Sequence, residues 1–241
     1  MPIRVSSWVL ERRFYAGMII ALAAMVFVGF APSFYLRSFF AGGRSLTPLL
    51  YVHGLVFSAW MALLITQSAL ITSRRPDLHR KLGALGLLLA LAMLIAAAAT
   101  ALTLATRLLQ SKGANAAGHA ALALLDLPVF ASLVLAAVLL RRRSQTHKRL
   151  MLLATVVIIG AAVNRLPLPA EFSGRFVRFL LLDLFLCSLV VWDVLSAGRI
   201  YLATLAGTSA IILDQIGQVY LGQSEWWSQS IAKLLRVMTS S

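Results

Sequence analysis

The chain has 241 residues, of which 60% are hydrophobic and 12% are charged, and its mean hydropathy is +0.87. A soluble domain of this length cannot bury so much apolar surface, so the composition excludes an ordinary globular protein and predicts a multi-pass membrane protein. The formal net charge is +14. Because the Lys and Arg residues flank apolar runs, membrane topology and anionic lipid headgroups account for them. We therefore expect the lipid bilayer as a partner, and no nucleic acid.

Apolar runs long enough to cross a bilayer recur along the whole chain. A span needs about 20 apolar residues, and seven candidates are found, at residues 14–36, 48–72, 80–106, 116–140, 148–164, 176–197 and 200–221. The fifth run is short and the seventh carries Asp214, Gln215 and Gln218, so the count is six or seven. The predicted fold class is all-α: a polytopic membrane helical bundle of about seven transmembrane helices, forming one integral membrane domain over residues 1–241.

The distribution of positive charge predicts the orientation. With the N-terminus inside, 13 of the 22 Lys and Arg residues fall in inner segments, and the two densest clusters, at 74–81 and 141–149, are both inner. Positively charged loops stay cytoplasmic. The first apolar run is too long for a signal core and lacks a small-x-small cleavage site, so we expect a retained first span. These features predict a multi-pass protein of the bacterial cytoplasmic (inner) membrane, with a cytoplasmic N-terminus.

The span at 48–72 carries amphipathic side chains on one face. Thr47 and Pro48 are a plausible cap and first helical position. His53, Trp60 and Gln67 follow at intervals of seven residues, which drift by only about 20° per step around a helix. We expect this face to point into the bundle, and Trp60 and Gln67 to belong to a polar or proton-handling site.

The span at 80–106 begins with Asp77, a predicted N-cap, and with His79. Small residues share the His79 face: Gly83, Gly86, Ala90 and Ala97. They predict either close helix packing or room for a flat macrocycle beside a ligating histidine, and the sequence leaves both open.

In the span at 116–140, His119 is followed seven residues later by Asp126, and Pro128 is expected to bend the helix. A carboxylate at that depth is costly unless it is paired, hydrated or protonated. Asp126 is therefore either a hydrogen-bonding partner of a neighbouring helix or part of a proton relay.

The remaining segments complete the predicted organisation. The last span has a polar face of Tyr201, Thr204, Thr208 and Gln215, and residues 225–238 form an amphipathic surface tail. We expect a four-helix core over 48–165, with peripheral helices at 14–36, 176–197 and 200–221.

The core contains an internal repeat that carries all four histidines. His53 and His79 are 26 residues apart, and His119 and His147 are 28 apart, with matching basic strings SRRPDLHRKLG and RRRSQTHKRLM. The core thus reads as a duplicated helical hairpin. Alternate crossings put His53 and His119 near one membrane face and His79 and His147 near the other, about 30 Å away.

This placement of histidines resembles the ascorbate-reducible type of transmembrane di-haem cytochrome. The resemblance implies two b-type haems, each held by two histidines, with His53 paired to His119 and His79 to His147. It further implies a membrane oxidoreductase that passes electrons between faces, a quinone or another electron donor or acceptor as partner, and Arg80, Lys81, Lys148 and Arg149 near the haem propionates.

The strings HGLVFSAW, LHRKLG and HKRLML also resemble those of a family of bacterial multi-pass membrane proteins to which no activity is attached. This resemblance implies the membrane fold alone.

Two alternatives stay open. Four imidazoles also suit copper or zinc. The chain is otherwise a cofactor-free small permease or a membrane assembly protein, with Asp126, Asp183 and Asp214 as its functional groups. The sequence contains no nucleophile elbow, phosphate-binding glycine loop or HExxH motif.

Overall fold

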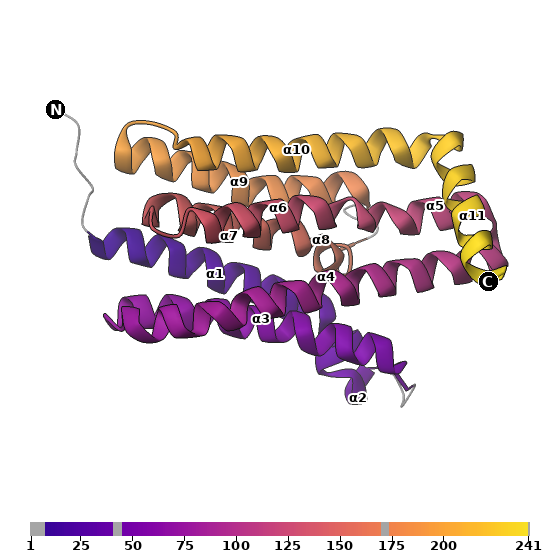
Figure 1. Ribbon diagram of the computed structural model, residues 1–241, viewed down its shortest axis with the longest axis horizontal. Helices are drawn as coiled ribbons and strands as arrows, with labels where there is room; N and C mark the ends of the chain where they lie inside the picture. The colour runs from indigo at the N-terminus through magenta and orange to yellow at the C-terminus, as the bar shows by residue number, and fades with distance from the viewer. Residues whose placement is uncertain (1–7, 41–44, 170–173, 241) are drawn as a thin grey trace.

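The computed structural model describes residues 8–40, 45–169 and 174–240, and every regular element in these ranges is a helix. The long helices lie side by side along the long axis of the molecule, and a final helix crosses one end (Figure 1). The predicted all-α class is confirmed.

Five helical stretches are long and apolar enough to cross a membrane. They are α1 (Trp8–Phe30) with the π-helical turn η1 (Ala31–Tyr35), α3 (Pro48–Thr72), α4 (Pro76–Lys112), the stretch Ala114–Leu139, and α9 (Arg175–Ala197). They coincide with the predicted spans at 14–36, 48–72, 80–106, 116–140 and 176–197. Five such helices fit a multi-pass membrane protein.

The two other predicted spans form helices with different properties. Residues 148–164 fall in α7 (Ser144–Ile158) and the short α8 (Gly160–Val163), and residues 200–221 fall in α10 (Leu202–Gln223). Neither is among the five helices that qualify as spans by length and hydropathy. The count of seven spans and the hairpin repeat stay predictions.

The start of α3 agrees with the sequence, whereas the start of α4 does not. Thr47 Oγ1 accepts a hydrogen bond from the backbone N–H of Leu50 at 3.4 Å, and Pro48 is the first helical residue. The prediction that Asp77 caps the next helix is wrong, because α4 begins at Pro76 and Asp77 lies in its first turn. Proline suits the first helical position because its φ is preset and its missing N–H is not needed there.

The helix over Ala114–Leu139 is interrupted upstream of Pro128, as expected. It consists of α5 (Ala114–Ala121), the 3₁₀ turn η2 (Leu122–Leu124) and α6 (Asp126–Leu139). Pro128 has no N–H to donate, and its ring crowds the carbonyl four residues earlier, that of Leu124. The break therefore falls where the proline removes regular α-helical bonding.

The principal hydrophobic core includes α1, which the sequence placed at the periphery. Tyr15, Met18, Leu22 and Val26 of α1 are buried in it together with residues of α3, α4, α6, α7, α9 and α10. A Cβ added at Gly29 would overlap the carbonyl oxygen of Ala162 in α8. α1 and α8 thus approach backbone to backbone.

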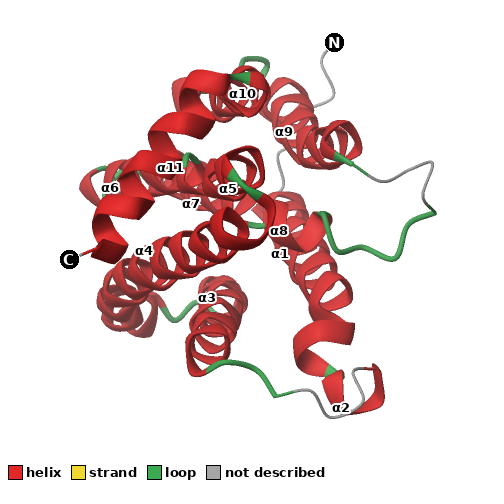
Figure 2. Ribbon diagram, turned by 90° about the vertical axis from the view of Figure 1, so that its right-hand side faces the viewer, coloured by secondary structure: helices red, strands yellow, loops and turns green. Residues whose placement is uncertain are grey.

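The tail forms helix α11 (Glu225–Ser240), which crosses the end of the bundle beside α5 (Figures 1 and 2). Its Ile231 and Leu235 are buried with Ala105, Ala117 and Ala121, which belong to α4 and α5. Trp227 Nε1 donates to the carbonyl oxygen of Gly118 at 2.9 Å. An amphipathic helix therefore closes what we call the α11 end.

The opposite end of the bundle carries the turns between α3 and α4 and between α6 and α7 (Figure 1). These turns hold Arg74, Arg75 and Arg141–Arg143, so we call it the basic end.

Candidate functional site

His79 and His147 meet at the basic end. His79 lies in the first turns of α4, and His147 in the first turn of α7. Their ring centroids are 6.3 Å apart and the ring planes are nearly perpendicular, at 89°. Of the two predicted histidine pairs, this one is brought together.

The hydrogen bonds of the two imidazoles differ. His147 Nδ1 lies 2.8 Å from the carbonyl oxygen of Ala137 in α6. A carbonyl only accepts, so this contact assigns the proton to Nδ1 and leaves Nε2 with a free lone pair. His79 Nδ1 is buried and makes no hydrogen bond to any described residue. The pair thus retains two ring nitrogens without a hydrogen bond to the described residues, His147 Nε2 and His79 Nδ1.

Small residues next to His79 pack helices together. A Cβ at Gly86 would lie 3.3 Å from Leu63 of α3, whereas a Cβ at Gly83 would meet only Gln67, at 4.0 Å. Ala90, further along the same face, is buried. The glycine at position 86 therefore serves the packing of α3 against α4, and room remains one turn beyond His79.

Two of the cations expected near haem propionates already have carboxylate partners. Arg149 is 1% exposed, and its guanidinium donates to Asp193 Oδ1 at 2.9 and 2.6 Å. Lys148 binds Glu11, which also accepts from Gln145. The buried guanidinium of Arg149 is thus compensated by Asp193, so a role for it beside a cofactor stays a prediction.

The Arg149 network joins three helices and was not predicted. Asp193 Oδ2 accepts from Thr204 Oγ1 at 2.5 Å and from the Tyr201 N–H at 3.1 Å, and the guanidinium lies over the Tyr201 ring at 3.7 Å. The signal was present, since Arg149 and Asp193 are ionisable groups within apolar runs. The predicted polar face of α10 is confirmed here, because Thr204, Thr208 and Gln215 are all buried.

The other predicted pair has separate surroundings. His53 Nδ1 contacts Thr100 Oγ1 of α4 at 3.3 Å, and its ring stacks on Phe57. His119 is exposed, and its Nδ1 lies 2.9 Å from the carbonyl oxygen of Asn115 in its own helix. Within the described ranges, no ring contact or hydrogen bond joins His53 to His119. A site between them stays a prediction.

Trp60 and Gln67 of α3 form hydrogen bonds with different helices. Trp60 is 1% exposed and donates from Nε1 to Thr155 Oγ1 at 3.2 Å, and its ring contacts Phe130 edge to face. Gln67 Nε2 donates to the backbone oxygen of His79 at 3.2 Å. The face of α3 that carries His53, Trp60 and Gln67 thus points to α4 and α7, as expected.

Asp126 belongs to a polar cluster formed with α9 and α10. Gln218 Nε2 donates to Asp126 Oδ1 and to Asp214 Oδ2, both at 2.8 Å, and its Oε1 accepts from Arg178 at 2.6 Å. Asp126 is also the first residue of α6, where the helix dipole favours a negative charge. The cluster borders a cavity of about 10 Å³, roughly the space of one water molecule.

The third acidic residue considered, Asp183, is held separately. Its Oδ1 accepts from Gln215 Nε2 at 2.9 Å. Arg178 was not predicted, although an arginine in an apolar span is expected to face the bundle interior.

Comparison with known proteins adds no match. No protein-family model, curated protein or solved structure is significantly similar to the chain. Within the part of the chain that the structure describes, two arrangements bring polar functional groups together: the His79–His147 pair and the Asp126–Gln218–Asp214 cluster.

Proposed function

We propose that the chain is a membrane electron-transfer protein that binds b-type haem between His79 and His147. The observation that supports it is the approach of two imidazoles from α4 and α7 at the basic end. A haem needs only two protein ligands, because its own nitrogens supply the rest, whereas structural zinc takes four.

The spacing fits one metal between two rings. A metal–nitrogen bond is about 2.0–2.1 Å, so two imidazoles that would hold one metal have ring centroids no more than about 6 Å apart. The observed separation is 6.3 Å.

The hydrogen bonds support the same interpretation. Metal-bound histidines ordinarily donate their other N–H to a carbonyl or carboxylate, which fixes the tautomer and ring orientation. The Ala137 carbonyl does this for His147. His79 contributes a buried ring nitrogen without a partner among the described residues.

A side chain of α3 helps to position the site. The Gln67 bond to the His79 carbonyl fixes the start of α4 against α3. Bound haem would supply one-electron transfer, with a potential set in part by its two imidazole ligands. The positive-inside rule places this site near the cytoplasmic face, with a quinone or another carrier as electron partner.

The test is an optical spectrum of the detergent-purified protein, dithionite-reduced minus air-oxidised, with haem quantified per chain. We expect a sharp reduced band of six-coordinate b-type haem. His79→Ala and His147→Ala should each lose it. His119→Ala is the matched control, because that imidazole is exposed and bonded within its own helix, and it should retain the band.

A flat spectrum from folded protein expressed with ample haem would overturn the proposal. Loss of haem in His53→Ala and His119→Ala, with retention in His79→Ala, would move the site to the other pair.

A small permease is the second candidate, and the partly buried cluster of Asp126, Asp214 and Gln218 favours it. The flat spectrum would place it first. In that case, Asp126→Asn should reduce transport activity more than His147→Ala does.

A further inference from the structure

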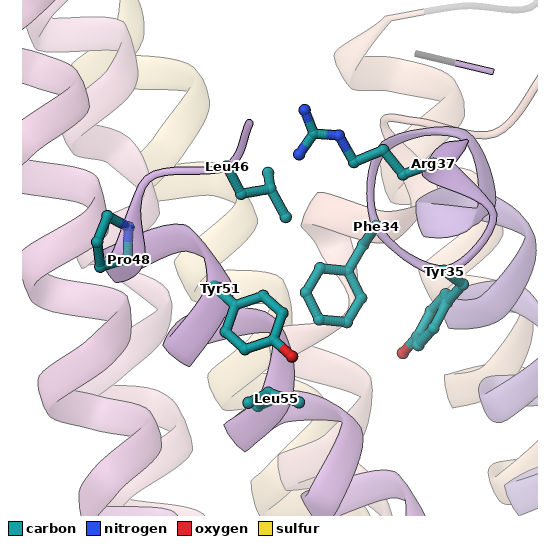
Figure 3. Close-up of a pocket in the computed structure, with 7 residues that line it drawn as sticks. All are labelled: Phe34, Tyr35, Arg37, Leu46, Pro48, Tyr51 and Leu55. Atoms are coloured by element: carbon teal, nitrogen blue, oxygen red, sulfur yellow. The ribbon is translucent and has the colours of Figure 1, made fainter. Parts of the chain in front are cut away.

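A groove of about 680 Å³ opens at the α11 end, between the end of α1 and the start of α3 (Figure 3). We call it the aromatic groove. It is lined by Phe34, Tyr35, Arg37, Leu46, Pro48, Tyr51 and Leu55.

The sequence builds one wall of the groove with a π-helical turn. In η1, which contains Pro32, the Leu36 N–H donates to the Ala31 carbonyl oxygen at 2.7 Å. Such wide turns are frequent at functional sites. The turn directs Phe34 to Gly54 of α3, where an added Cβ would overlap the Phe34 ring. The wall is thus fixed by contact with the opposite helix.

A second contact closes the bottom of this wall. Tyr35 Oη and Ser58 Oγ are 2.8 Å apart, and Ser58 Oγ donates to the Gly54 carbonyl oxygen at 2.7 Å. The tyrosine is therefore anchored and its ring remains part of the lining.

Among the described residues that line the groove, Arg37 alone is charged. It begins the short helix α2 (Arg37–Phe40), and its guanidinium extends over Phe34 toward Leu46 on the facing wall (Figure 3). The side chain forms no ion pair or hydrogen bond with the part of the chain that the structure describes. A cation at the mouth of an apolar groove is left to bind an external anion.

The position of the groove relative to the candidate spans indicates which kind of anion it would bind. The groove lies where the candidate spans Trp8–Tyr35 and Pro48–Thr72 end and begin. The neighbouring Phe39 and Phe40 are 83% and 64% exposed, as expected of aromatic residues at the level of lipid headgroups. At that depth, an apolar groove with a positive mouth is complementary to a molecule with an anionic head and an aliphatic chain.

We propose that the aromatic groove binds an anionic phospholipid. Its phosphate pairs with Arg37, and one acyl chain runs along Phe34, Tyr51 and Leu55 toward the bilayer core. The net negative headgroup distinguishes it from a zwitterionic lipid, since the described residues of the lining include one cation and no carboxylate. This proposal is independent of haem binding at the opposite end.

The experiment is native mass spectrometry of the delipidated full chain, titrated with phosphatidylglycerol or with phosphatidylcholine of the same acyl chains. We expect one tightly bound phosphatidylglycerol on the wild type. Arg37→Ala should weaken its binding about five-fold, to the level of phosphatidylcholine. Leu46→Trp, which fills the groove and leaves the charge, should weaken both lipids.

Arg107→Ala is the matched control, because Arg107 is an exposed arginine in the last turns of α4, also at the α11 end. This variant should bind phosphatidylglycerol like the wild type. Equal phosphatidylglycerol binding by the wild type and Arg37→Ala would overturn the proposal. Equal weakening by Arg37→Ala and Arg107→Ala would also overturn it, because binding would then follow net charge and not the groove.

Discussion

Arg149 and Asp193 form an ion pair whose side chains are 1% and 0% exposed. Both partners have further hydrogen bonds: Arg149 also donates to Gln145, and Asp193 accepts from Thr204 and Tyr201. Burying two charges is costly, and satisfied hydrogen bonds offset that cost. The pair ties the start of α7, which also carries His147, to the last turns of α9.

Breaking this pair from one side should be strongly destabilising. Arg149→Met leaves the Asp193 carboxylate buried without its cation, so we expect the free energy of unfolding to fall by about 3–5 kcal/mol. Arg149→Met/Asp193→Asn should lose less than Arg149→Met alone, because the remaining charge is removed. Denaturant unfolding in detergent measures both.

The exposed pair of Arg75 with Asp77, at 3.6 Å, is the control, and Arg75→Ala should leave stability unchanged. Equal losses in the single and double variants would show that Asp193 carries no uncompensated charge.

Single residues also show why the sequence predicted the His79–His147 pair but not the polar contacts made by Arg149 and Asp126. His79 and His147 stood out because each follows a basic string in a repeated pattern. The partners of Arg149 and Asp126 lie 44 and 92 residues away. Periodicity gives the face of a helix but not which helix it meets, so pairings over such separations depend on packing.

At the scale of elements, hydropathy predicted seven spans, and five of them coincide with helices long and apolar enough to cross a membrane, because apolar length is a local property. Residue types also predicted the Thr47–Pro48 start of α3 and the interruption near Pro128, since both depend on backbone chemistry within one turn. The contribution of α1 to the principal hydrophobic core was not predictable in the same way. It depends on Gly29 allowing contact with Ala162, 133 positions later.

We expect the α1–α8 contact to fail when a single methyl group is added. Gly29→Ala puts a Cβ onto the Ala162 carbonyl oxygen, which is backbone and cannot rotate away. Overpacking of this kind costs about 1–3 kcal/mol. Thermal unfolding in detergent should show a lower midpoint.

Gly17→Ala is the matched control in the same helix, because a Cβ there would meet nothing within 4 Å. Alanine favours a helix over glycine by about 0.5–1 kcal/mol, so Gly17→Ala should be neutral or slightly stabilising. A stabilising Gly29→Ala would mean that α1 lies further from α8.

At the scale of the whole molecule, the bundle joins two chemically different ends. The basic end holds the two facing imidazoles and the buried ion pair, and the α11 end holds the aromatic groove and the amphipathic helix. If the membrane plane lies across the bundle, each end lies at one surface. The side on which each loop is found then decides the number of spans.

The segment of α7 and α8 should cross the bilayer even though it is too short and too polar to qualify as a span alone. α7 packs along α6, which belongs to a candidate span, so the bundle encloses its polar groups.

Ser144 and Asn164 flank the segment and are both exposed. Cys187 is the only cysteine, and Cys187→Ser therefore gives a clean background for Ser144→Cys and Asn164→Cys. In sealed vesicles of one orientation, a membrane-impermeant maleimide should label one of these two and reach the other only after permeabilisation. Labelling of both from the same side would show that residues 144–163 return to the face they left, which would reduce the span count.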